Sequence, residues 1–414
     1  NKAVETISRV LSAPPKLLGF VLPRSFTDGQ LYKDIRTKLV ETYDAVSIIA
    51  LPDNVFQYSN AETVLVLASG QSNNDAVELH RMFIAKGDYE QFWETGKPTW
   101  ENKETFKRST ASSYPLWEHS LATNLKEYLK DLIKLEDVAD IHRGIEYQDS
   151  VSNHVSNIQR TGFKKGLQKV EDGLNPYAVL NHRYIDLNPN SMLYKAYLRP
   201  WESPKVIASA IRISRGAWKI ISATDRSGLY CYHAFHGIWP KGDFSLEIIT
   251  AVLNGLVANA LLSISPQTRN IPIKDLRPIP VPNLSENDIQ WIEQLVAKYK
   301  ESLTSKNYSR SLDIVTQINV LILSRYNLPS WLLSDLLEYI GYEEQPRINV
   351  SFVEQIRMRH RKLVDKKFLE GLTPKETQEL EQINNMLDAV EEKYYTPIKN
   401  ELAMLSESIL TNKQ

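Results

Sequence analysis

The run Leu17-Leu18-Gly19-Phe20-Val21-Leu22-Pro23 is short, apolar and ended by proline. These features predict a buried strand. Asp28 follows as a residue suited to cap a helix, and the apolar residues between positions 31 and 40 recur at a spacing of three and four. We therefore expect a helix directly after this strand.

Two further runs rich in β-branched residues, 45–51 and 63–68, predict strands on either side of the turn Pro52-Asp53-Asn54. The order strand, helix, strand, strand predicts the closing edge of an α/β sheet within residues 1–70. So small a fragment leaves a strand edge unpaired and buries little apolar surface. We expect its missing strands to come from another chain or from a segment that precedes Asn1.

The remainder of the chain changes character twice. Residues 71–136 are mixed and polar, which predicts a segment that bridges to the next domain. Residues 137–284 hold short strand-like runs separated by Gly, Asn and Pro, and one helical pattern, which predicts a mostly β domain. Residues 285–414 show helical periodicity almost throughout and include a hairpin from residue 352. Together these segments predict a mixed α+β fold.

Positive charge is concentrated in the middle of the chain. Across all 414 residues, 49 Lys+Arg face 50 Asp+Glu, a net charge of −1. Between Ile141 and Pro280 the counts are 17 and 10, so this region carries +7 and the remainder −8. A basic region between acidic flanks is the footprint expected of phosphate contact. Chance clustering of charge on a solvated face remains the alternative.

The cysteine content and hydropathy indicate a cytoplasmic location. Cys231 is the only cysteine, so the sequence offers no disulfide framework and no thiolate metal site. No run approaches the roughly 18 apolar residues of a membrane span, and the N-terminus lacks a secretory signal. We expect no membrane partner.

Residues 210–221 form the segment most suggestive of nucleic-acid contact. It carries three cations and an aromatic ring: Arg212, Arg215, Trp218 and Lys219. If the segment is a strand, alternation places Arg212, Ser214 and Trp218 on one face and the other two cations on the opposite face. A bulge at Gly216 would instead direct the cations together.

Several phrases in order resemble a known family. Residues 19–23, Ile35-Arg36, residues 48–52, Val55-Phe56 and residues 61–67 resemble the last motif blocks of the gamma-class adenine-N6 DNA methyltransferases of restriction–modification systems. Asp140-Ile-His-Arg-Gly-Ile145 and residues 270–282 resemble the opening and closing phrases of their target-recognition domain, which is similar to those of type I specificity subunits. The resemblance covers residues 10–345 and implies binding of double-stranded DNA.

The departures from that family are as informative as the matches. The family's glycine-rich cofactor loop and its catalytic tetrad (Asn or Asp, Pro, Pro, Tyr or Phe) are absent, and the first 70 residues contain only Gly19, Gly29 and Gly70. Asn175-Pro176-Tyr177 mimics the tetrad but lacks its second proline, and we interpret it as a loop turn. The chain opens at Asn1 rather than methionine, and we expect it to be the C-terminal part of such an enzyme.

The resemblance implies a parent activity that transfers a methyl group from S-adenosylmethionine to adenine N6. This chain alone is expected to bind no cofactor and to be inactive. Its expected partners are DNA and the missing N-terminal methyltransferase part or a catalytic subunit. The alternative is a non-enzymatic specificity module that docks onto a separate methyltransferase subunit.

The candidate site residues follow from the resemblance and from the cations. Phe56 would stack on the adenine flipped out of the duplex, or is a core aromatic residue. The residues expected to contact DNA are Arg212, Ser214, Arg215 and Lys219, followed by the loop cations Arg143, Lys164, Lys165, Lys169 and Arg269. His233 and His236 would point to opposite faces of a strand, so we expect no metal site.

Overall fold

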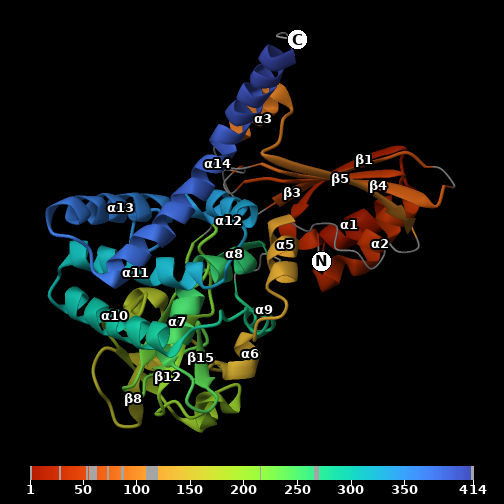
Figure 1. The fold of residues 1–414 in the computed structure, drawn as a ribbon. Coiled ribbons are helices and arrows are strands. Elements are labelled where there is room, and N and C mark those ends of the chain that lie inside the picture. Colours follow the sequence, from red (N-terminus) through yellow and green to blue (C-terminus); the bar gives the residue numbers. More distant parts are fainter. Residues whose placement is uncertain are drawn as a thin grey trace. The chain divides into compact units, whose positions relative to one another are not determined.

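The computed structural model describes residues 2–27, 29–52, 55, 63–71, 74–84, 88–108, 120–214, 216–264 and 270–411 (Figure 1), with the side chains of residues 30, 393, 394 and 396–411 left undescribed. The chain divides into two compact units. Unit 1 comprises Asn1–Ser120 and Ile264–Thr268, and unit 2 comprises Leu121–Ser263 and Arg269–Gln414.

Unit 1 is built on one five-stranded sheet. Its strands follow the order β1-β3-β2-β4-β5, in which only the β2–β4 pair is parallel. The bounds are β1 Leu17–Pro23, β2 Ala45–Ala50, β3 Thr63–Ser69, β4 Ala76–Phe83 and β5 Trp100–Lys107. The first three strands confirm the sequence prediction. The prediction that the sheet ends at residue 70 is wrong, because β4 and β5 extend it.

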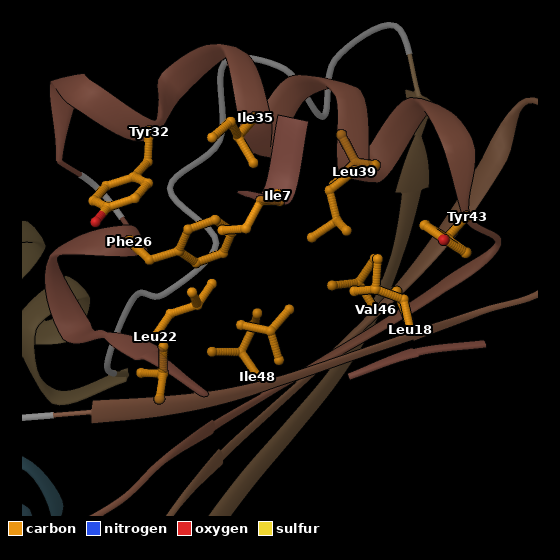
Figure 2. Close-up of a cluster of buried hydrophobic side chains, with 14 of the residues drawn as sticks. Ile7, Leu18, Leu22, Phe26, Tyr32, Ile35, Leu39, Tyr43, Val46 and Ile48 are labelled. Atoms are coloured by element: carbon orange, nitrogen blue, oxygen red, sulfur yellow. The ribbon is translucent and has the colours of Figure 1, made fainter. Parts of the chain in front are cut away.

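Two helices, α1 (Lys2–Val10) and α2 (Lys33–Thr42), contribute to a core that Figure 2 shows beside the sheet. Ile7, Leu39 and Ile48 are all at most 2% exposed there. The helix begins at Lys33, after a short 3₁₀ turn at Gln30–Tyr32, and therefore later than expected. The proposed cap Asp28 lies outside the described residues.

The sheet also carries apolar residues that face away from this core. A smaller cluster joins Ile49, Leu51 and Ile84 to Phe92 of α3 (Tyr89–Thr95). At the β1 edge no helix of the described chain covers the corresponding side chains: Leu17 is 72% exposed and Val21 is 51% exposed.

The β part of unit 2 holds two four-stranded sheets, ordered β13-β12-β15-β6 and β14-β8-β11-β7. The first contains β6 Ala139–Arg143, β12 Lys205–Ser209, β13 Ser222–Asp225 and β15 Phe235–Pro240. The second contains β7 Val155–Ser156, β8 Phe163–Leu167, β11 Arg183–Asp186 and β14 Tyr230–Cys231. The short pair β9 (Leu174–Asn175) and β10 (Ala178–Val179) closes on Pro176 and Tyr177, which confirms that Asn175-Pro176-Tyr177 is a turn.

Helices pack against the first of these sheets. Helix α7 (Leu246–Asn254) contacts β12 and β13 on one side and α10 and α11 on the other (Figure 1). Helix α8 (Leu256–Ile264) follows α7 with a bend of 54°. The remaining short helices of this part are α5 Ser120–Tyr128, α6 Leu135–Val138 and α9 Ile273–Leu276.

The C-terminal part of unit 2 is helical, as predicted. Its helices are α10 Glu286–Thr304, α11 Tyr308–Ser324, α12 Ser330–Leu336, α13 Phe352–Leu369 and α14 Pro374–Thr411. The start of α14 is a capping box, in which the Thr373 N–H donates to Glu376 Oε2 (2.9 Å) and the Glu376 N–H donates to Thr373 Oγ1 (3.3 Å). Among the described helices, none is alone long and apolar enough to cross a membrane, and α7 with α8 passes only as a bent pair.

The core beside the sheet of unit 1 predicts that a buried leucine and an exposed leucine contribute differently to the stability of the unit. Leu39→Ala removes a side chain that is 1% exposed and should destabilise the unit by about 2–5 kcal/mol. Leu17→Ala is the matched control, because Leu17 is 72% exposed and its loss should change stability by at most about 0.5 kcal/mol. Hydrogen exchange of the β2 amides measures both. Equal protection in the two variants would contradict this account of the core.

Candidate nucleic-acid interface

Residues 210–214 and 216–221 form a loop and do not continue β12 as a strand. β12 ends at Ser209, and the chain turns back so that the Ile213 N–H donates to the Lys219 carbonyl (3.1 Å). The Ser214 hydroxyl donates to the Trp218 carbonyl (2.5 Å). The predicted alternation of side chains between two faces is therefore wrong.

The backbone of this loop is held by buried side chains. The N–H groups of Lys219 and Ile220 both donate to Asn259 Oδ1, at 2.8 and 2.9 Å. The Ser222 N–H donates to Asn254 Oδ1 (2.8 Å). Because buried N–H groups outside a strand ladder need other partners, these asparagines fix the path of the loop.

The C-terminal helical region supplies a further anchor. The Ala217 N–H donates to Glu343 Oε2 (2.5 Å), and the indole N–H of Trp218 donates to the Glu343 carbonyl (3.3 Å). A Cβ atom at Gly216 would lie 2.1 Å from the same carboxylate, so glycine permits this close approach. The loop and the turn that contains Glu343 are therefore joined.

Two residues of the predicted DNA-contact set are used inside the protein. Lys219 is 2% exposed, and a buried ammonium does not reach DNA, so its predicted contact is wrong. Its position follows from the turn in the loop, which directs it inward beside Trp218, itself 1% exposed. The Ser214 hydroxyl is engaged within the loop.

Arg212 lines a cleft of about 490 Å³ within unit 2. Four segments and two single residues form its walls: 168–171, 211–213, 232–234, 346–347, Val151 and Ile221. Among the described residues, three cationic side chains line this cleft, those of Lys169, Arg212 and Arg347, against one carboxylate, that of Glu171. The cleft is therefore electropositive and suited to an anionic ligand.

The structure gathers some of the other predicted residues near this cleft. The Arg143 Nε–H donates to the carbonyl of His233, a lining residue (3.1 Å). Lys164 and Lys165 are exposed on β8, which leads directly into segment 168–171, and Lys164 pairs with Glu202 at 3.4 Å. Phe56, Arg215 and Arg269 lie outside the described residues, and their roles stay predictions.

Arg347 is a cationic lining residue that the sequence did not single out. It lies 135 positions after Arg212 in a region predicted to be helical. Its only local signal is a turn-forming context, Gln345-Pro346-Arg347-Ile348-Asn349.

His154 is held between two carboxylates beside the cleft residue Val151. Its Nδ1 lies 2.9 Å from Asp186 Oδ2, and its Nε2 lies 2.5 Å from Asp149 Oδ1. The ring of Tyr147 stacks on the imidazole at 4.3 Å. Burial opposes protonation, but the hydrogen bonds to Asp186 and Asp149 outweigh it and raise the pKa of His154.

His233 and His236, the two histidines considered as a metal pair, have different surroundings. His233 lines the cleft, and burial lowers its pKa. Its Nδ1 is buried without a hydrogen-bond partner among the described residues. Burial lowers the pKa of His236 to about 4, and its Nε2 lies 2.8 Å from the Ile271 carbonyl.

The first three glycines of unit 1 make local backbone contacts. Gly19 lies inside a paired strand opposite Leu67, and the Gly29 carbonyl accepts a hydrogen bond from Arg36 (2.8 Å). Gly70 follows β3, where its carbonyl accepts from the Asp44 N–H (3.0 Å). Gly29 lies in the segment between β1 and α2, whereas Gly19 lies within a strand and Gly70 directly after one.

Comparison with known proteins gives a structural likeness only. No protein-family model and no curated protein matches the sequence. The fold is similar to that of the type IIL restriction-modification enzyme MmeI in complex with DNA (9% identity, TM-score 0.47, 81% of this chain and 51% of that chain). It is also similar to the DrdV–DNA complex (8%, 0.43, 92% and 50%) and to the HsdS subunit from Thermoanaerobacter tengcongensis (13%, 0.28, 50% and 49%). The chain spans about half the length of each, and likeness at this level assigns no function.

The His154 cluster predicts a pH-dependent stability of unit 2. Because the folded state raises this pKa above its ordinary value of 6.5, the stabilisation is fully present below that pH and is lost as the pH rises through the folded pKa. Urea unfolding at a series of pH values should show this loss in the parent chain and not in His154→Asn. His182→Asn, at an exposed histidine, is the control and should keep the parent profile. An unchanged profile in His154→Asn would rule out this cluster as the cause.

Proposed function

We propose that this chain recognises a specific sequence in double-stranded DNA, as the target-recognition part of an adenine-N6 DNA methyltransferase of a restriction–modification system. The observation that carries the proposal is the cleft in which Lys169, Arg212 and Arg347 face a single carboxylate. Apart from Pro346 and Arg347, its lining residues lie in the region with a net charge of +7, between the two phrases that resemble the boundaries of a target-recognition domain.

The cleft suits DNA because its cations differ in kind and are held on short, fixed loops. An arginine can donate two hydrogen bonds to the O6 and N7 atoms of guanine, whereas lysine acts mainly as a point charge for phosphate. Arg212 lies at the start of a loop whose later residues Ala217 and Lys219 are bonded to Glu343 and Asn259. A side chain presented from such a fixed loop keeps a defined direction, which base reading requires.

The edge of the sheet in unit 1 supports a methyltransferase part as the partner. Within the described chain β1 pairs only with β3, so its other edge is open to a further strand. Leu17 and Val21 are exposed on the same strand. A partner that continues the sheet would satisfy both the backbone groups and these side chains.

The alternative, a specificity module that docks onto a separate methyltransferase subunit, shares the DNA cleft. The open β1 edge favours a partial catalytic domain over that alternative, because docking alone does not require an incomplete α/β sheet. The activity of the whole enzyme, with S-adenosylmethionine as the methyl donor, follows only from the sequence resemblance. We assign no step of that reaction to the described residues.

The DNA proposal predicts a salt-dependent affinity that Arg212 shapes. Selection from random duplexes should return a preferred site, and binding by fluorescence anisotropy should weaken steeply with salt. Arg212→Ala should cost about 1–3 kcal/mol on that site and relax the preference at one position. Arg310→Ala, an exposed arginine of α11 outside the cleft, is the control and should bind as the parent does. Absence of salt-dependent binding would reject the proposal.

The methyltransferase part of the proposal has its own test. The isolated chain, incubated with radiolabelled S-adenosylmethionine and its selected duplex, should incorporate no label into adenine. The same duplex should be methylated at adenine N6 once the preceding methyltransferase part is supplied, with nucleoside mass spectrometry as the readout. Label incorporated by the isolated chain would refute the division of roles.

A further inference from the structure

The turn that follows α12 presents one arginine to the cleft in a fixed direction. The N–H groups of Ile348 and Asn349 donate to the Gln345 carbonyl, at 3.0 and 2.8 Å, and the Gln345 N–H donates to the Val350 carbonyl (3.2 Å). Gln345 is 3% exposed, and its side-chain carbonyl accepts from the Gln355 amide (3.2 Å). This buried glutamine ties the turn to α13.

The backbone of Arg347 adopts a conformation that its residue type disfavours. Its φ is +71°, in the left-handed region that glycine and asparagine occupy more readily. Strain of this kind persists where the surrounding structure imposes it and is found often at binding sites. The hydrogen bonds around Gln345 impose it here, and their effect is to turn the Arg347 side chain toward the cleft that it lines.

Several cations of the helical region are paired with carboxylates, whereas in the described part of the chain Arg347 is not. Arg325 pairs with Asp288 (2.6 Å), Arg359 pairs with Glu379 (2.7 Å) and Lys362 pairs with Asp313 (2.7 Å). Arg347 is exposed and has no ion pair among the residues that the structure describes. A cation left without a carboxylate on the wall of an electropositive cleft is available to an external anion.

A hydrogen bond also joins this turn to the loop that follows β12. Glu343 accepts the Ala217 N–H (2.5 Å), so the segments that carry Arg212 and Arg347 are connected by a direct hydrogen bond. The loop that carries Arg212 and the turn that carries Arg347 are therefore held together.

We propose that Arg347 binds a phosphate of the DNA backbone, so that the helical region contributes to the DNA-binding surface in addition to any role as a spacer. This inference rests on the proposed function and deepens it. Phosphate is favoured over a base edge because Arg347 lies on an exposed turn at the wall of the cleft, where phosphate contacts set the orientation of a duplex. The neighbouring Lys169 adds a second charge for the same backbone.

The test compares charge and conformation at this one position. Arg347→Asn removes the charge but keeps a residue that tolerates positive φ, so the turn should still form. In the full chain, its affinity for a mixed-sequence duplex pool and for the selected site should fall by the same factor, about five-fold or more. The slope of log affinity against log salt should flatten by about one phosphate contact. Arg347→Lys should restore most of the slope, and Arg310→Ala should leave it unchanged.

The outcomes separate the inference from the function on which it rests. If Arg347→Asn keeps the parent slope while Arg212→Ala weakens binding, the inference is wrong and the proposed function stands. If Arg347→Asn weakens only the selected site and spares the mixed pool, the residue reads a base and the phosphate assignment is wrong. If the parent chain itself shows no salt-dependent binding, both fail.

Discussion

The arrangement of the cleft depends on one constraint. The backbone from Ala217 to Ser222 is buried, and within the described chain the residues before β13 have no partner strand to accept their N–H groups. Buried N–H groups need acceptors, and leaving one unpaired costs roughly 1–3 kcal/mol. Here side chains from elsewhere supply the acceptors: Asn254, Asn259 and Glu343. The loop is thereby attached both to the α7–α8 helices and to the helical C-terminal region, which explains why the β part and the helical part form one compact unit.

The cleft differs from the C-terminal hairpin of unit 2 in how far its positive charge is neutralised by carboxylates. The first helix of the C-terminal hairpin is rich in cations, and the acidic second helix neutralises part of that charge through the pairs Arg359–Glu379 and Lys366–Glu376. In the cleft, Glu171 is the single carboxylate against three cations. The local balance of charge, more than the total over the hairpin, therefore identifies where an anion would bind.

The sequence predicted those elements whose signal is local. β1, β2 and β3 are runs of apolar and β-branched residues, and the α14 cap lies within four residues of sequence. β4 and β5 were missed because their outward-facing positions are polar and pair across strands, as in His80–Glu101 (2.9 Å) and Lys103–Glu78 (3.0 Å). The sequence predicts a strand over residues 210–221 because the anchor Glu343 lies 126 positions from Ala217 and leaves no local signal of a loop. Arg347 was missed for the same reason, since its place in the cleft arises only from tertiary contacts.

A buried ion pair within the first sheet of unit 2 helps to set the path of the chain from that sheet to the second one. Lys205 and Asp225 are 0% and 3% exposed and pair at 2.5 Å between β12 and β13. Asp225 also accepts the N–H groups of Ser227 and Leu229 (both 2.8 Å), which sets the path into β14 of the second sheet. β12 leads to Arg212, and β14 pairs with β8, which leads to Lys169. Because removing one partner of such a pair leaves a buried charge uncompensated, the placement of the strands that lead to Arg212 and Lys169 is costly to change.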